Sequence, residues 1–229
     1  LVAKIPNNVS MENAAYTTIA SIAMQGIRVA KPQIGEFVAV SGLGLVGLTT
    51  VMLLKSNGCI VCGIDLDENK ILLAKKMGID FTINLKKDNA EESIKKFSGG
   101  MGVDHTLICA STDNNEPIKL AGNITRSKGV VTVVGTVGMD IPRQPYYLKE
   151  LEIRLSMSYG PGRYDLSYEE MGIDYPYGYV RWTEKRNMSS VLNLMSQNKL
   201  DFSNITTHKF LFEDAKRAYD IVKNNDLFV

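Results

Sequence analysis

Two kinds of hydrophobic pattern alternate along the first 140 residues. Short continuous apolar runs predict buried strands, and longer segments with apolar residues every three or four positions predict helices. We expect the strands at 36–41, 59–64, 81–84, 103–109 and 129–134. We expect the helices at 11–31, 46–56, 68–77, 89–98 and 115–124.

The type of strand indicates the type of sheet. Continuous apolar strands, rather than alternating ones, are typical of parallel sheets that are covered on both faces. Strands that alternate with helices along the chain form a doubly wound sheet. The sequence therefore predicts an α/β fold of the Rossmann type, with about six parallel strands flanked by helices. Residues 151–157 are the candidate for the sixth strand.

The pattern changes after Gly138. Residues 159–186 are rich in Tyr, Gly and Pro and lack clear periodicity. Beyond them we expect helices at 188–198 and 213–223 and a strand at 206–211. We interpret 15–229 as one domain that carries the 159–186 segment as an insertion.

Composition excludes several classes of partner. The 229 residues include 26 basic and 25 acidic side chains, for a net charge of +1, so we expect neither nucleic acid nor an anionic membrane as partner. No apolar stretch is long enough to span a membrane, and no signal-peptide pattern opens the chain. We expect a cytoplasmic protein with a small-molecule ligand.

Cysteine chemistry is the next alternative. The three cysteines cannot all pair, which favours a reducing compartment. Cys59 and Cys62 have the CxxC spacing, but they fall on a predicted strand, where residues three apart point to opposite faces. We therefore expect them to fill the core rather than to bind a metal or carry redox chemistry.

The segment from Ser41 to Gly47 matches GxGxxG between a predicted strand and a predicted helix, the context in which this motif indicates dinucleotide binding. Gly42 would form the tight turn, Gly44 would leave room for the pyrophosphate, and Gly47 would let helix and strand pack closely. The phosphates would meet the unpaired N–H groups and the positive dipole end of the helix. That helix begins with Leu45 and Val46.

An acidic residue at the end of the next strand completes the dinucleotide pattern. Asp65 lies 18 residues after Gly47, where a carboxylate accepts hydrogen bonds from the adenosine ribose. It would repel a 2′-phosphate, and Leu66 offers no positive charge to offset that, so NAD is favoured over NADP. The alternative is a helix-capping role for Asp65, which Asp67 fills equally well.

These motifs together resemble the medium-chain dehydrogenase/reductase superfamily of the alcohol dehydrogenase type. The resemblance also rests on the order of Pro6–Ala15, Gly102-Val-Asp104 and Lys128–Gly135, and it covers essentially the whole chain. It implies an enzyme that transfers hydride between NAD(H) and an alcohol or carbonyl compound, with sugar-derived substrates as one option. It also implies a homodimer that pairs the sheet edges of two cofactor domains.

The resemblance assigns further candidate residues around the cofactor. It places Lys70 near the ribose. It places the ends of the fourth and fifth strands beside the nicotinamide, which here are Cys109, Ala110, Ser111, Gly135, Thr136 and Val137.

The same resemblance implies parts that we do not find. A GroES-like catalytic domain would precede this chain, with residues 1–14 as the connector, so the chain would be a fragment and inactive by itself. A further zinc ligand would fall near Thr17, but no Cys, His, Asp or Glu lies between Ala14 and Gly35, so we expect no zinc in this chain. Catalytic residues are not assigned; His105 and His208 are interpreted as structural.

Aromatic residues cluster in the insertion. Six of the ten tyrosines and the only tryptophan fall within 159–182. The segment from Ser158 to Trp182 resembles a bacterial branch that joins a zinc-dehydrogenase-like half to an inositol-dehydrogenase-like half. One hypothesis is a substrate-facing lip in which Arg163 or Arg181 holds a polyhydroxylated or anionic ligand.

The alternative for this segment, which we favour, is internal packing or a subunit contact, because Tyr and Trp are enriched at interfaces. A non-catalytic NAD-binding or assembly module, with this segment as the partner contact, is the alternative to an enzyme.

Overall fold

One parallel sheet organises the molecule. The computed structural model describes residues 2–223, and in them six strands pair in the order β3-β2-β1-β4-β5-β6, every pair parallel. The strands are β1 (Phe37–Ser41), β2 (Ile60–Asp65), β3 (Phe81–Asn84), β4 (Val103–Ile108), β5 (Thr125–Val133) and β6 (Glu152–Leu155). The α/β doubly wound fold that the sequence predicts is confirmed.

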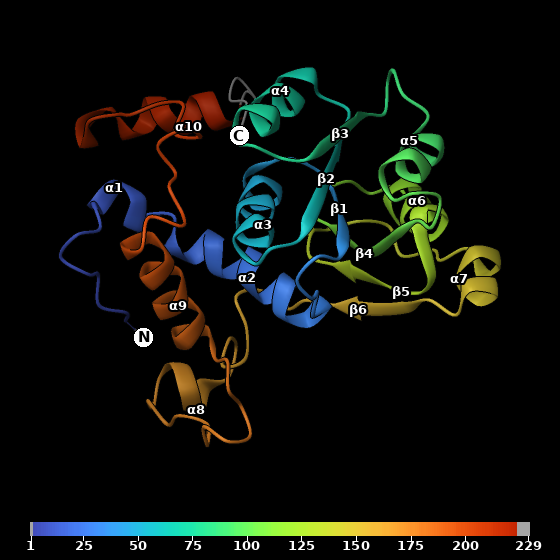
Figure 1. The fold of residues 1–229 in the computed structure, drawn as a ribbon. Coiled ribbons are helices and arrows are strands. Elements are labelled where there is room, and N and C mark those ends of the chain that lie inside the picture. Colours follow the sequence, from blue (N-terminus) through green and yellow to red (C-terminus); the bar gives the residue numbers. More distant parts are fainter. Residues whose placement is uncertain (1, 224–229) are drawn as a thin grey trace.

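Helices cover both faces of this sheet (Figure 1). The helices are α1 (Met11–Ala14), α2 (Thr17–Ala30), α3 (Leu45–Ser56), α4 (Glu68–Lys76), α5 (Ala90–Phe97), α6 (Glu116–Ile124), α7 (Arg143–Lys149), α8 (Leu166–Glu169), α9 (Glu184–Ser196) and α10 (Ala215–Lys223), with a 3-10 turn at Phe212–Asp214. In Figure 1, α2, α3 and α9 lie on one side of the sheet, and α5 and α6 lie on the other.

Alternation along the buried strands divides the core. Val38 and Val40 of β1 pack in one core with α2 and α3, whereas Ala39 between them packs in the core that includes α5. Cys59 belongs to the first core and Cys62 to the second. The expectation that the CxxC pair points to opposite faces is therefore confirmed, and both thiols are free and buried.

The strand order creates a crevice. The chain runs from β1 outward to β2 and β3 and then returns to β4 on the other side of β1. Connections of opposite direction leave the carboxyl ends of β1 and β4 uncovered between them, which is where ligands bind in doubly wound sheets.

The predicted helix at 11–31 is wrong in one respect, because it is two helices. Ser10 caps α1 as expected, accepting from the Asn13 N–H at 3.2 Å. The break falls at Tyr16, whose ring stacks on Phe202 with centroids 4.6 Å apart. Its hydroxyl also lies 2.8 Å from Thr206 Oγ1. These tertiary contacts from the far end of the chain fix Tyr16 and end α1.

The predicted strand at 206–211 is also wrong. Within the described residues this segment pairs with neither of the sheet's edge strands, β3 and β6. It is held by side chains instead: Thr206 contacts Tyr16, and Lys209 forms an ion pair with Glu12 at 2.7 Å.

Other elements also differ from the prediction, among them the short helix α8 and the start of α9 at Glu184 rather than at residue 188. β5 begins at Thr125, four residues before the predicted start. The pairing of β4 with β5 has a register irregularity between Val103 and His105, and this irregularity accommodates the polar residues Arg126–Lys128 within the strand. The helix α7 was not predicted, since Pro145 lies within its seven residues; proline is tolerated there because the first turn needs no N–H donor.

The aromatic insertion forms an arm that projects from the body below α9 (Figure 1). Part of it packs on itself: Tyr168 is buried, stacks on Tyr175 and donates to Thr183 Oγ1 at 2.8 Å. Tyr164, Tyr177 and Tyr179 are exposed. We use the name arm below for residues 159–182.

No helix between residues 2 and 223 is long and apolar enough to cross a membrane. The last six residues of the predicted 15–229 domain lie outside the described residues.

Candidate functional site

The glycine turn after β1 is the first part of the site. Gly42 has φ +94°, and a Cβ there would lie 2.6 Å from the backbone nitrogen of Ala110. A Cβ on Gly47 would lie 1.8 Å from the carbonyl oxygen of Gly42. The fold itself therefore requires both glycines, as the sequence predicts for a tight turn and close packing.

Gly44 differs from these two glycines. It is the N-cap of α3 with extended backbone (φ −70°, ψ −170°), a conformation open to any residue, and a Cβ there would meet nothing within 4 Å. The open space in front of Gly44 lies at the positive end of the α3 dipole, where an anion is favoured. Folding does not explain this glycine, whereas a ligand in that space does.

Asp65 ties the end of β2 to the glycine turn. Its Oδ2 accepts from the Leu43 N–H at 2.7 Å, and its Oδ1 accepts from the N–H groups of Leu66 and Asp67 at 2.7 and 2.9 Å. An ionised carboxylate has roughly four acceptor positions, so at least one stays available to a ligand hydroxyl. Asp67, not Asp65, caps α4 by accepting from the Asn69 N–H at 2.8 Å.

A cavity of about 670 Å³ lies at the carboxyl ends of β1, β2 and β4. Several predicted residues line it: Gly42, Gly44, Asp65, Lys70, Cys109, Ala110 and Ser111. Further lining residues are Ser41, Ile64, Leu66, Leu85, Thr112, Asn114, Glu116, Pro117 and Leu120. The structure thus brings together the glycine turn, the acid after β2 and the end of β4.

The other predicted residues do not line this cavity. Leu45, Val46 and Gly47 belong to the first turn of α3, and Gly135, Thr136 and Val137 follow β5; none of these six lines the cavity. A Cβ on Gly135 would lie 2.1 Å from the Ala110 carbonyl oxygen, and Thr136 O accepts from the Thr112 N–H at 2.8 Å. The loop after β5 therefore supports the loop after β4.

Sequence reasoning missed the apolar part of the cavity. Leu66 and Leu85 directly follow β2 and β3, and Pro117 and Leu120 come from the first half of α6. Leu66 is 53% exposed, unusual for a leucine beside a buried strand. A leucine placed just past each strand end was the available signal for an apolar ligand surface.

Cys109 lines the cavity but does not offer a thiolate. Burial raises the pKa of its thiol to about 12, and its sulfur lies 3.6 Å from Thr50 Oγ1. A thiol that stays protonated at neutral pH is a poor nucleophile and a poor metal ligand.

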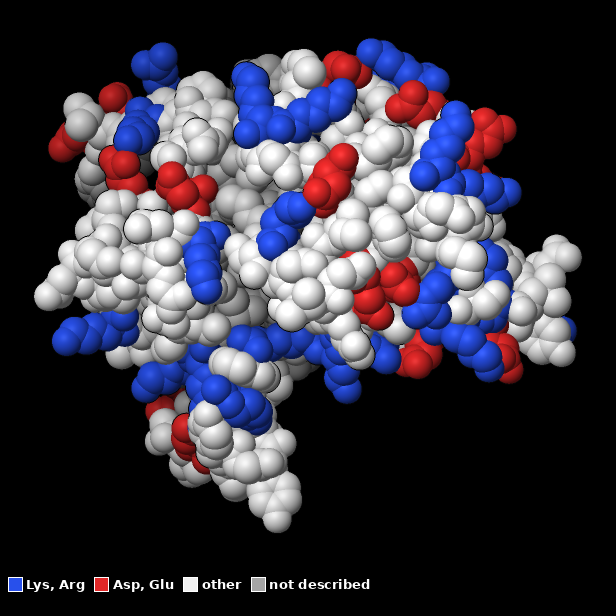
Figure 2. All heavy atoms as spheres, in the orientation of Figure 1, with Lys and Arg blue, Asp and Glu red and all other residues white. Residues whose placement is uncertain are grey.

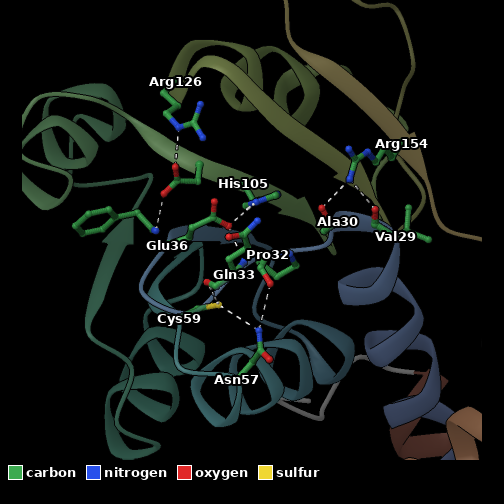
Figure 3. A network of polar contacts seen from close by, with 12 residues as sticks. Val29, Ala30, Pro32, Gln33, Glu36, Asn57, Cys59, His105, Arg126 and Arg154 are labelled. Atoms are coloured by element: carbon green, nitrogen blue, oxygen red, sulfur yellow. Dashed lines mark hydrogen bonds and ion pairs between the residues drawn. The ribbon is translucent and has the colours of Figure 1, made fainter.

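Both histidines lie away from the cavity. His105, near the amino ends of the strands, places Nε2 2.9 Å from Glu36 Oε2 (Figure 3). Burial lowers its pKa more than Glu36 raises it. His208 is exposed and contacts only Thr207 through its ring nitrogen.

No group of three or more His, Cys, Asp or Glu side chains that could hold a metal occurs within residues 2–223. Thr17, the position nearest to a zinc ligand of related proteins, instead donates its hydroxyl to the Ala14 carbonyl at 2.6 Å.

Comparison with known proteins matches the chain to dehydrogenases. The family model described as zinc-binding dehydrogenase matches residues 46–171. The D-xylulose reductase of Scheffersomyces stipitis is 28% identical over 224 residues, which are 96% of this chain and 56% of that protein. An alcohol dehydrogenase of Geobacillus stearothermophilus is 34% identical over 142 residues, 62% of this chain and 41% of that protein.

The fold has solved counterparts. The alcohol dehydrogenase TADH from Thermus sp. ATN1 superimposes with a TM-score of 0.79 at 22% identity, covering 98% of this chain and 60% of that one. The chain thus spans little more than half the length of the relatives that it matches along its whole length.

Proposed function

The chain belongs to the zinc-binding dehydrogenase family, and on that basis we propose that it is the cofactor-binding part of an NAD-dependent oxidoreductase. The enzyme would transfer hydride between NAD(H) and an alcohol or carbonyl compound. Sugar-derived polyols are the substrate class that we favour, because relatives over nearly the whole chain are named D-xylulose reductase and sorbitol dehydrogenase. Bound NAD would supply the hydride chemistry, and the chain would position it.

One observation carries the proposal: the open space in front of Gly44. It adjoins a cavity long enough to pass from the glycine turn to the end of β4. Unpaired N–H groups at the start of α3 would hold the pyrophosphate. Asp65 and Lys70 would hold the ribose, and the leucines after β2 and β3 would contact the adenine.

Asp65 is the basis for proposing NAD rather than NADP. Its carboxylate lines the cavity and keeps a free acceptor position for a ribose hydroxyl. A 2′-phosphate placed there would meet a negative charge, and Lys70 is the single basic side chain among the lining residues that could offset it.

Substitution of Asp65 tests this preference. Asp65→Asn keeps an oxygen that can accept from Leu43 and removes the charge. We expect the purified protein to bind NADH at least about tenfold more tightly than NADPH, because a repulsion of about 1.4 kcal/mol between Asp65 and the 2′-phosphate lowers the affinity tenfold. Asp65→Asn should reduce this ratio of affinities. Asp67→Asn is the matched control, because asparagine caps helices as well as aspartate does. Equal affinities of the unaltered protein for NADH and NADPH would remove the basis of the ribose assignment.

We also infer that two copies of the chain pair through β6. β6 is one of the two outer strands of the sheet, and the nearby Leu148, Leu155 and Met157 are exposed. An unpaired strand edge with apolar side chains favours addition of another strand.

A further inference from the structure

Two arginines contact the only tryptophan of the chain. The Cζ atom of Arg28, from α2, lies 3.2 Å from the Trp182 ring centroid, and that of Arg181 lies 3.7 Å from it. Both guanidinium groups therefore lie against the same indole, which brings their positive charges close together. Figure 2 shows basic side chains gathered where the arm joins the body.

Neither arginine has an acidic partner among residues 2–223. The other arginines of this region are paired, Arg163 with Glu169 and Arg186 with Asp174, both at 2.6 Å. The cluster of Arg28, Arg181 and Trp182 therefore carries two positive charges that only the indole faces offset.

Arg28 also has an unused donor. Its Nη2 lies 3.3 Å from Ser190 Oγ and 3.2 Å from Met24 Sδ, but its Nε is buried without a hydrogen-bond partner. Burial first, and Arg181 second, lower the pKa of Arg28 to about 10. Burial and the charge of Arg181 both disfavour the charged form of Arg28. A bound anion would favour the charged form and so offset both effects.

We propose that Arg28, Arg181 and Trp182 form a binding site for a small phosphate dianion, either inorganic phosphate or a phosphate monoester. The guanidinium fork matches phosphate oxygens, and a phosphate monoester carries a charge of about −1.5 to −2 near neutral pH. That charge matches the two unpaired arginines. Arg181 is exposed and Trp182 is half-buried, so part of the cluster is open to an ion from solution.

This site is separate from the cofactor cavity. None of its three residues lines that cavity, and Arg28 lies near the end of α2, two residues before Ala30. The proposal thus stands or falls independently of the cofactor assignment.

Trp182 reports on its own site, because no other tryptophan contributes fluorescence. We would titrate the protein at pH 8 with inorganic phosphate, glycerol phosphate and acetate, holding ionic strength constant with sodium chloride. We expect a saturable fluorescence change with both phosphates, at affinities at least about tenfold higher than that of acetate, because the dianions meet both charges.

Variants separate this site from other basic surface. Arg181→Gln removes an exposed side chain and should weaken phosphate binding at least about tenfold with the fold intact. Arg143→Gln is the matched control: Arg143 also stacks on a tyrosine, Tyr147, at 4.7 Å, and its loss should change the affinity less than twofold. Gly44→Val, which blocks the proposed pyrophosphate site, should leave the Trp182 signal unchanged.

If phosphate binding does not change the Trp182 fluorescence, equilibrium dialysis with labelled phosphate tests the site instead. The loss of one bound phosphate per chain in Arg181→Gln supports the site. Equal phosphate binding by Arg181→Gln and the unaltered protein, or acetate binding as tightly as phosphate, would overturn it.

Discussion

At the scale of single residues, the three glycines of the turn separate folding from binding. Gly42 and Gly47 are fixed by contacts with backbone atoms of the chain itself. Gly44 has no such contact. All three look alike in the sequence, where the motif predicts them together, and only the structure shows that Gly44 alone has open space in front of it.

Gly42→Ala should destabilise the fold. Its φ of +94° strains any other residue, and its Cβ would overlap Ala110. We expect a loss of about 2–6 kcal/mol, the range of backbone strain combined with overpacking, measured by urea unfolding. An unchanged midpoint would show that the turn adapts, contrary to the close contact described.

Glu184 is the other residue with an unusual position. It is fully buried, both carboxylate oxygens lack hydrogen-bond partners, and burial raises its pKa while the Arg163 charge opposes that shift. An acid whose pKa is raised in the folded state binds more protons in the folded than in the unfolded protein. The free-energy cost of burying its carboxylate is therefore absent below the unfolded pKa and grows as the pH rises above it.

Glu184→Gln should therefore raise Tm at pH 8 by at least about 2–4 °C, equivalent to roughly 1 kcal/mol in a domain of this size. The gain should shrink as the pH falls from 8 toward about 4.5 and be absent below that, where the glutamate is protonated in both states. Scanning calorimetry across this pH range is the measurement. A gain that is constant with pH would mean that charge burial is not its cause.

At the scale of elements, the alternation of strands and helices could be predicted because each element up to β5 carries its own periodic pattern. Two of the failures depend on contacts between distant segments. Tyr16 breaks a helix because Phe202 stacks on it. Residues 206–211 have a strand pattern but join neither sheet edge, and contacts with Tyr16 and Glu12 hold them instead. Neither fact is visible in a local window.

The site was predictable to a similar degree. Glycine and acidic positions have spacing rules, so Gly42, Gly44 and Asp65 could be found in the sequence. The apolar lining could not, because Leu85 and Leu120 come from separate elements that only the sheet order brings together. The Arg28 and Trp182 pair, 154 positions apart in the sequence, had no local pattern at all.

Arg154 links two elements, and its substitution should lower the free energy of unfolding. Its Nη1 donates to the carbonyl oxygens of Val29 and Ala30 at 3.0 and 2.8 Å, linking β6 to the end of α2 (Figure 3). Arg154→Met keeps most of the apolar stem and should cost about 1.5–3 kcal/mol in unfolding free energy. Glu152→Gln, which removes only the exposed ion pair of Arg154, should cost less than about 1 kcal/mol; equal effects would contradict the helix-end role.

At the scale of the whole molecule, pairing through β6 would join two sheets. Leu155→Lys places a charge on an exposed side chain at that edge and should convert a dimer to a monomer without lowering the monomer's stability. Light scattering after gel filtration gives the mass. A monomeric unaltered protein would refute the pairing, and a dimeric Leu155→Lys would place the interface elsewhere.

The central claim is that the open space in front of Gly44 holds the pyrophosphate of NAD. NADH binding to Gly44→Val, followed by calorimetry, tests it most directly, because the extended backbone there accepts any residue and a Cβ there meets no atom within 4 Å. We expect binding to be lost while the unfolding free energy changes by about 1 kcal/mol or less, the effect of an unfavourable N-cap. A folded Gly44→Val that binds NADH as the unaltered protein does would contradict the account.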